Sequence, residues 1–255
     1  MKNRTSIIFC RCSAQVIPDE KAEELATAFR KLRSNVFELR DLCAVSVHEK
    51  DLLESLLKKS ERTIIVACYS RAVKNMISQT GIDCDNFETI NFKELPTGEI
   101  LQKIKEGYTI EEGKADYQIV KSSLDVPPWY PVIDKSRCIL CGKCAKFCLF
   151  GVYKFNGKSL ETVNPLACKN HCPACGRTCP TSAIIFPRLP ENTPLAGAEP
   201  GDEKKATGDS SLFVMLNERN RNRKNIFRAG IVQQAEEERR KALEELKNTQ
   251  NNSHD

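Results

Sequence analysis

The sequence contains no uninterrupted apolar run that approaches the roughly 20 residues needed to cross a bilayer. Its first residues, MKNRTSIIFCRC, are interrupted by Arg11 before the apolar core of a signal peptide could form. Histidine is also scarce, because the chain has three, His48, His171 and His254, scattered far apart in the sequence. We therefore expect a cytoplasmic protein without membrane insertion and without a histidine-based acid–base site.

A second absence concerns flavins and nucleotides. The chain has no G-x-G-x-x-G stretch, which is the turn that binds dinucleotides. We therefore predict neither a flavin nor a nucleotide. The net charge of +5 is mild and gives little reason by itself to expect nucleic-acid binding.

Cysteine, by contrast, is abundant, with 13 among 255 residues. Reducing compartments keep thiols reduced, so a chain without an export signal is not expected to carry a disulfide framework. Metal ligation is therefore the leading interpretation of the cysteines.

The chain divides by pattern into four segments. In residues 1–95, short apolar runs such as TSIIFC and RTIIVAC alternate with amphipathic stretches, which predicts a small parallel sheet covered by helices. Residues 96–130, with scattered glycines and the stiff VPPWYP, are assigned to a linker in which Trp129 packs against the segment after it. Residues 190–255 have the composition of a linker followed by two charged helices. Residues 131–189 contain most of the cysteines.

Eight of these cysteines form two consecutive runs. The first run is spaced C-x2-C-x2-C-x3-C and the second C-x3-C-x2-C-x3-C-P. The offset between the runs is 30 for the first pair and 31 for the other three, which indicates an internal duplication with one inserted residue. The members are Cys138, Cys141, Cys144 and Cys148 in the first run, and Cys168, Cys172, Cys175 and Cys179 in the second.

Two kinds of metal site would explain such runs. Paired C-x2-C motifs make tetrahedral zinc sites. A cubane iron–sulfur cluster instead needs thiolates from four directions, three of which can come from a single loop. The third cysteine in each loop fits a cubane better than zinc.

Residues 131–189 resemble the bacterial two-cluster ferredoxin family. The resemblance implies an α+β ferredoxin-like domain with two [4Fe–4S] clusters. The sequence departs from the family pattern at two places. Leu149 stands where proline usually follows the fourth cysteine, and CKNHC has one residue more between its two cysteines than the first run has. The implied ligands are Cys138, Cys141, Cys144 and Cys179 for one cluster, and Cys168, Cys172, Cys175 and Cys148 for the other.

Four further cysteines lie near the ends of predicted strands: Cys10, Cys12, Cys43 and Cys68. The carboxyl ends of parallel strands share one edge of a sheet, so we expect these thiols to meet there. A third cluster, zinc, a redox-active thiol group and simple buried packing all remain open. The remaining cysteine, Cys84, is expected to be a plain loop thiol.

The stretches FCRC, DLC, IIVACYSR and ETINFKE also resemble a known family, the amino-terminal domain of the flavoprotein subunit of heterodisulfide reductases. The match covers about residues 5–95. It implies an α/β iron–sulfur domain, and hence a third [4Fe–4S] cluster at the four amino-terminal cysteines. The flavin-binding part of that family is absent from this chain.

We therefore expect an electron-transfer component of an oxidoreductase rather than a complete enzyme. It would relay single electrons through two or three [4Fe–4S] clusters, from a soluble donor to a flavoprotein or heterodisulfide-reductase-like partner. One alternative is a stand-alone reductase that acts on a disulfide or small acceptor at the amino-terminal cysteines. Another is a redox-sensing nucleic-acid binder that uses a basic cluster, although the neighbouring stretch is rich in glutamate and nucleic-acid binders usually interleave their basic residues with stacking aromatics. That cluster comprises Arg219, Arg221, Arg223, Lys224 and Arg228.

Overall fold

The computed structural model describes residues 5–200, 237–241 and 244. The chain divides into two units, Met1–Glu203 and Lys204–Asp255. Residues 237–241 and 244 are helical, within the second helix predicted for the tail. The other predicted tail helix and the basic cluster at 219–228 lie outside the described residues. Among those that are described, no helix is long and apolar enough to cross a membrane.

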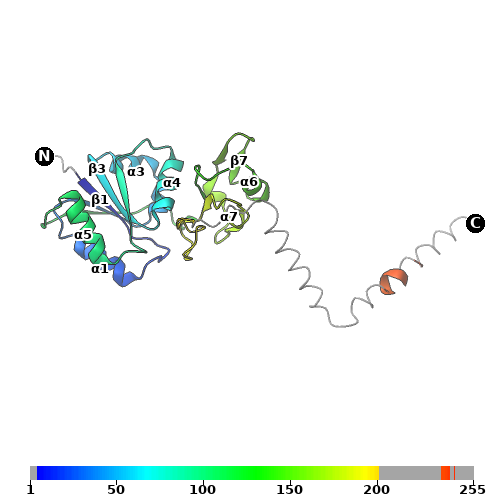
Figure 1. The fold of residues 1–255 in the computed structure, drawn as a ribbon, viewed down its shortest axis with the longest axis horizontal. Helices are drawn as coiled ribbons and strands as arrows, with labels where there is room; N and C mark the ends of the chain where they lie inside the picture. Colours follow the sequence, from blue (N-terminus) through cyan, green and yellow to red (C-terminus); the bar gives the residue numbers. More distant parts are fainter. Residues whose placement is uncertain (1–4, 201–236, 242–243, 245–255) are drawn as a thin grey trace, which may run out of the picture. The chain divides into compact units, whose positions relative to one another are not determined.

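A parallel five-stranded sheet forms the first part of the larger unit (Figure 1). The strand order is β4-β3-β1-β2-β5. The central strands β1 and β3 are apolar on both faces and almost entirely buried, which is typical of a sheet covered on both sides. The predicted α/β fold is confirmed. The strands are β1 (Thr5–Cys10), β2 (Asn35–Leu39), β3 (Arg62–Ala67), β4 (Phe87–Asn91) and β5 (Asp116–Val120).

Five helices connect these strands and cover the sheet. α1 packs against α5, whereas α2 contacts both α3 and α4. The chain moves outward from β1 to β2 and then back across β1 to β3, so right-handed crossovers place the two helix groups on opposite faces. Figure 1 shows α1 and α5 on one side of the sheet, and α3 and α4 on the other. The helices are α1 (Asp19–Phe29), α2 (Leu42–His48), α3 (Lys50–Leu57), α4 (Ser70–Thr80) and α5 (Thr97–Tyr108).

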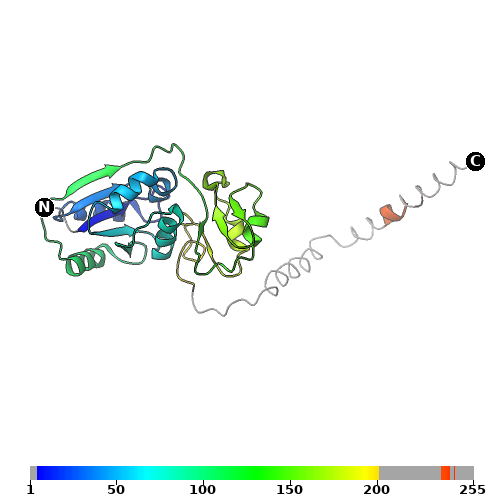
Figure 2. The same ribbon diagram turned by 90° about the horizontal axis from the view of Figure 1, so that it is seen from above.

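The prediction that residues 96–130 form a linker is wrong for most of that segment. α5 begins directly after Pro96, and β5 pairs in parallel with β2. β5 lies along one edge of the sheet (Figure 2). Its sequence, DYQIV, lacks an apolar run because most of its side chains are exposed at this edge, so the usual signal of a buried strand is missing.

The cysteine-rich module, residues 131–189, is built from two matching halves. In each half a strand precedes the cysteine run, a short helix lies within the run, and a strand follows it. Each strand pairs antiparallel with a strand of the other half, β6 with β9 and β7 with β8. Such pairing of strands between the halves is expected of a duplicated module with two-fold pseudosymmetry. The elements are β6 (Val132–Ile133), α6 (Lys143–Phe147), β7 (Tyr153–Phe155), β8 (Leu160–Thr162), the 3-10 turn η1 (Pro165–Ala167), α7 (Ala174–Arg177) and β9 (Ile184–Ile185).

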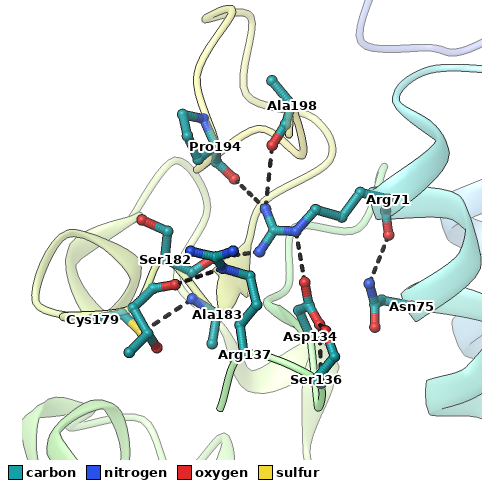
Figure 3. Close-up of polar contacts among 11 residues, drawn as sticks. Arg71, Asn75, Asp134, Ser136, Arg137, Cys179, Ser182, Ala183, Pro194 and Ala198 are labelled. Carbon is teal, nitrogen blue, oxygen red and sulfur yellow. Dashed lines mark hydrogen bonds and ion pairs between the residues drawn. The ribbon is translucent and has the colours of Figure 1, made fainter. Parts of the chain in front are cut away.

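A buried arginine of α4 joins the sheet to the module (Figure 3). Arg71 donates from Nε to Asp134 Oδ2 at 2.6 Å, and its other nitrogens donate to the carbonyls of Ser182 and Pro194. The side chains of Arg71 and Asp134 are 4% and 5% exposed. Trp129 packs in the same core, stacked on Phe186 with ring centroids 5.3 Å apart, as its predicted packing role requires.

Candidate iron–sulfur centres

The first group of thiols combines cysteines from both runs. Cys138, Cys141, Cys144 and Cys179 all line one small hollow. Gly142 starts α6 in the left-handed conformation, with φ 69°. A Cβ at this glycine would lie 2.4 Å from the ring of Phe155, so the loop that carries the first three cysteines passes very close to β7.

The remaining four cysteines form the second group. Besides burial, negative charge on Cys175, Cys172 or Cys148 raises the pKa of Cys168. The side chains of these four cysteines therefore lie near one another. Each group thus takes three cysteines from one run and the fourth from the other. The structure brings together the two sets that the ferredoxin resemblance implies. Which thiols bind a given cluster stays a prediction.

The loops that carry the two groups also match in backbone conformation. Leu140 (φ 54°) and His171 (φ 59°) each precede the second cysteine of their run. Gly151 (φ 65°) and Ser182 (φ 53°) form an equivalent pair after the runs. The two members of each pair are 31 residues apart in the sequence. All four have a positive φ, which residues other than glycine rarely adopt. The two loops are therefore wrapped in the same way, and the inserted residue lies before His171.

Burial makes several of these thiols weak acids. It raises the pKa of Cys144 and that of Cys168 to about 12 each, and the pKa of Cys175 to about 11. Thiolates at these positions therefore require a strong positive charge beside them, and metal ions supply such charge. The donor set of both groups thus fits iron–sulfur clusters.

Polar donors point at sulfur atoms of both groups. The backbone N–H of Ala183 donates to Cys179 Sγ at 3.3 Å, and the Tyr153 hydroxyl lies 3.1 Å from Cys175 Sγ. Burial raises the pKa of Tyr153, so its hydroxyl keeps its proton. Hydrogen bonds to ligand sulfur atoms are a main way in which proteins tune the reduction potential of a cluster.

A third group of thiols lies at the carboxyl edge of the sheet, as predicted. Cys10 ends β1 and is hydrogen-bonded to Cys12, Cys43 lies in the first turn of α2, and Cys68 directly follows β3. Cys12 interacts electrostatically with each of the other three. Cys10, Cys43 and Cys68 are buried, with exposed fractions of 5%, 5% and 9%.

The acidity of this third group is uneven. The hydrogen bond with Cys10 lowers the pKa of Cys12 to about 7, whereas that bond and burial raise the pKa of Cys10. Burial raises the pKa of Cys43, and it raises that of Cys68 to about 12. Four thiolates here would again need a cationic centre, so this donor set also fits a cluster.

Arg188, at the end of the module, reaches the third group. It forms an ion pair with Asp41 and donates to Ser13 Oγ at 3.1 Å. The same carboxylate caps α2 by accepting from the backbone N–H of Cys43 at 3.0 Å. Tyr130 also closes the site from the module side, since its hydroxyl donates to the Cys43 carbonyl at 2.9 Å. These contacts fix the third group against the module.

Sequence reasoning identified the cysteines but not these supporting side chains. Arg188 and Asp41 are 147 residues apart, so no local pattern links them. Asp41 has one usable signal, since an aspartate directly before LCAV is a helix N-cap pattern. Cys84 stands apart from the three groups, and its Sγ lies 2.6 Å from Asn86 Oδ1, as a loop thiol would.

A zinc site needs several ligand side chains close together. Within residues 5–200 and the short helical stretch near 240, no three histidine, cysteine, aspartate or glutamate side chains are arranged to hold a single metal ion.

Comparison with known proteins agrees with this chemistry. Residues 130–153, which contain the first cysteine run, match the 4Fe-4S binding domain family. An uncharacterized ferredoxin of Methanocaldococcus jannaschii is 30% identical over 141 residues, which are 52% of this chain and 88% of that protein. No solved structure gives a significant match. With its iron–sulfur ferredoxin-like domain, the chain belongs to the same ferredoxin family as this archaeal protein.

Proposed function

We propose that the protein is an electron carrier with three [4Fe–4S] clusters, two in the cysteine-rich module and one at the carboxyl edge of the sheet. It would relay single electrons to a flavin-bearing or heterodisulfide-reductase-like oxidoreductase. An iron–sulfur electron-transfer role follows from the ferredoxin relative and the 4Fe-4S domain. The number of clusters rests on one observation, the gathering of twelve cysteines into three groups of four.

The proposed ligands correspond to these groups, and each cluster, when bound, supplies a one-electron redox centre. The protein's part is to hold thiolates in buried surroundings and to direct donors such as the Ala183 N–H at their sulfur atoms. The ligands are Cys138, Cys141, Cys144 and Cys179 for the first cluster, Cys168, Cys172, Cys175 and Cys148 for the second, and Cys10, Cys12, Cys43 and Cys68 for the third.

The closed surroundings of the third group favour electron transfer over a substrate site. Three of its four thiols are buried, and Tyr130 and Arg188 close it from the module side. A disulfide substrate would need direct access to a thiol, whereas an electron can enter a buried centre through the protein. This supports a relay rather than a stand-alone reductase.

The crossed ligation in the module can be tested by pairs of substitutions. Cys148→Ala combined with Cys175→Ala should remove one cluster, because both thiols belong to the second group. Cys148→Ala combined with Cys144→Ala should remove both module clusters. Iron and acid-labile sulfide, measured after anaerobic reconstitution, should fall by about four atoms in the first double variant and about eight in the second. A loss of about eight iron atoms in the first double variant and about four in the second would instead show that each run binds its own cluster.

The third cluster has its own matched test. Cys12→Ala should lower the iron content by about four atoms per chain, and Cys84→Ala should leave it unchanged. Both substitutions remove one partly buried thiol from the same domain. Equal iron content in the two variants would restrict the clusters to the module.

A further inference from the structure

Five large apolar side chains are exposed around Cys148 and Cys168, two members of the second cysteine group. Leu149 is the most exposed, at 90%. Backbone bonds hold the two segments that carry these side chains together, since Val163 N donates to Val152 O at 2.9 Å. We call the set the apolar face. It consists of Phe147, Leu149, Phe150, Val163 and Leu166, with exposed fractions of 52%, 90%, 44%, 44% and 51%.

The surface around the apolar face is basic. The module contains nine lysines and arginines against two acidic residues, a formal charge of +7, whereas the whole chain carries +5. Clusters with their thiolates are anionic and offset part of this charge. Lys146 adjoins Phe147, Lys169 adjoins Cys168, and both are exposed. Neither forms an ion pair with another described residue.

We propose that the apolar face docks a small acidic one-electron carrier protein, whose own redox centre lies beside an exposed apolar patch. The inference rests on the proposed function, because the face flanks thiols assigned to the second cluster. An apolar centre with a charged rim suits such a partner, since burial of the centre gives affinity and the rim steers the encounter. The charge of the rim selects an acidic partner.

Charge alone would also attract nucleic acid, but the centre of the face favours a protein. Phe147 and Phe150 are its only two rings, whereas Leu149, which is by far the most exposed member, Val163 and Leu166 are aliphatic and offer no surface on which a base could stack. Leu149 also stands where two-cluster ferredoxins usually have proline, so its exposure sets this face apart from the family pattern.

The test is a binding titration with the full-length protein, reconstituted anaerobically. The probe is an acidic plant-type [2Fe–2S] ferredoxin, and calorimetry gives the Kd at low and at physiological ionic strength. The wild type should bind about tenfold more weakly at the higher ionic strength. Leu149→Ser should raise the Kd about tenfold at both. Lys146→Glu combined with Lys169→Glu should raise it about tenfold at low ionic strength and abolish the salt dependence.

Matched substitutions in the sheet domain provide the controls. Ile119→Ser changes an apolar side chain that is 47% exposed on β5. Lys103→Glu combined with Lys114→Glu reverses two exposed charges away from the module. Both controls should bind the ferredoxin with the wild-type Kd. Iron and sulfide content, measured for every variant, separates the two claims, because cluster loss bears on the proposed function and weaker binding with intact clusters bears on the face.

Several results would overturn the docking proposal. One is an unchanged Kd in the Leu149 and lysine variants when their clusters are intact. Another is a wild-type protein that does not bind the acidic ferredoxin, or that prefers a single-stranded oligonucleotide. A third is a dimer that Leu149→Ser converts to monomer by sedimentation without a change in Kd, since a second copy of the chain would then cover the face.

Discussion

Asp134→Asn removes the negative charge opposite Arg71 at the junction between the sheet and the module. The two side chains are almost completely buried, and Arg71 Nε lies 2.6 Å from Asp134 Oδ2. Removing one partner of a buried ion pair leaves the other charge uncompensated and costs about 3–5 kcal/mol. The lower end applies here, because the asparagine oxygen still accepts from Ser136 and Arg71 still donates to the Ser182 and Pro194 carbonyls.

A loss of about 3 kcal/mol of stability should lower the Tm of the first unit by about 6–12 °C, because the Tm of a unit of this size changes by about 2–4 °C per kcal/mol. The measurement is thermal unfolding of the reconstituted protein under anaerobic conditions at a fixed scan rate. Arg71→Lys should lower the Tm as well, because a lysine keeps the charge but its single nitrogen cannot reach acceptors that three separate guanidinium nitrogens contact.

The chain offers a matched control in the pair of Lys105 and Glu112. Its nitrogen and oxygen are also 2.6 Å apart, but the side chains are 39% and 80% exposed. Glu112→Gln should therefore leave the Tm nearly unchanged, since exposed pairs contribute little. If Asp134→Asn and Glu112→Gln changed the Tm equally, the claim that burial makes the Arg71 junction important would be refuted.

Two further substitutions test local features of the cluster sites. Gly142→Ala should destabilise the module and remove about four irons, because its Cβ would meet Phe155 at 2.4 Å in a left-handed backbone. Gly157 also has a left-handed backbone, but an added Cβ would meet open space there. The Gly157→Ala variant should therefore keep its iron and lose only about 1 kcal/mol of stability, as measured by its Tm. Tyr130→Phe should cost about 1 kcal/mol by removing the hydrogen bond from its hydroxyl to the Cys43 carbonyl. An unchanged Tm for Tyr130→Phe would mean that water replaces the hydroxyl there.

The parts of this fold that the sequence predicts correctly are those with a local signal. β1 and β3 are short apolar runs, and α4 is an amphipathic stretch closed by Gly81 in the left-handed conformation. The meeting of Cys10 and Cys68 follows from the same signals, because parallel strands share their carboxyl edge. Periodicity and topology together were enough to place these thiols.

The features that sequence reasoning missed depend on contacts between distant segments. β5 is stabilised by pairing with β2 rather than by its own apolar side chains, so its pattern resembles a loop. Arg71 and Arg188 have the sequence context of ordinary surface charges, and their burial depends on the module packing against the sheet domain. Such contacts bring together residues 63 and 147 positions apart, which no local pattern can encode.

Reductive titration of the full-length protein tests the central claim most directly. The anaerobically reconstituted protein is titrated with dithionite, and its visible absorption is followed through reduction and reoxidation. A three-cluster carrier should bleach reversibly with the uptake of about three electrons per chain, one for each cubane. Absorption that does not bleach, or that bleaches irreversibly with loss of iron, would contradict an electron-transfer role for these cysteines.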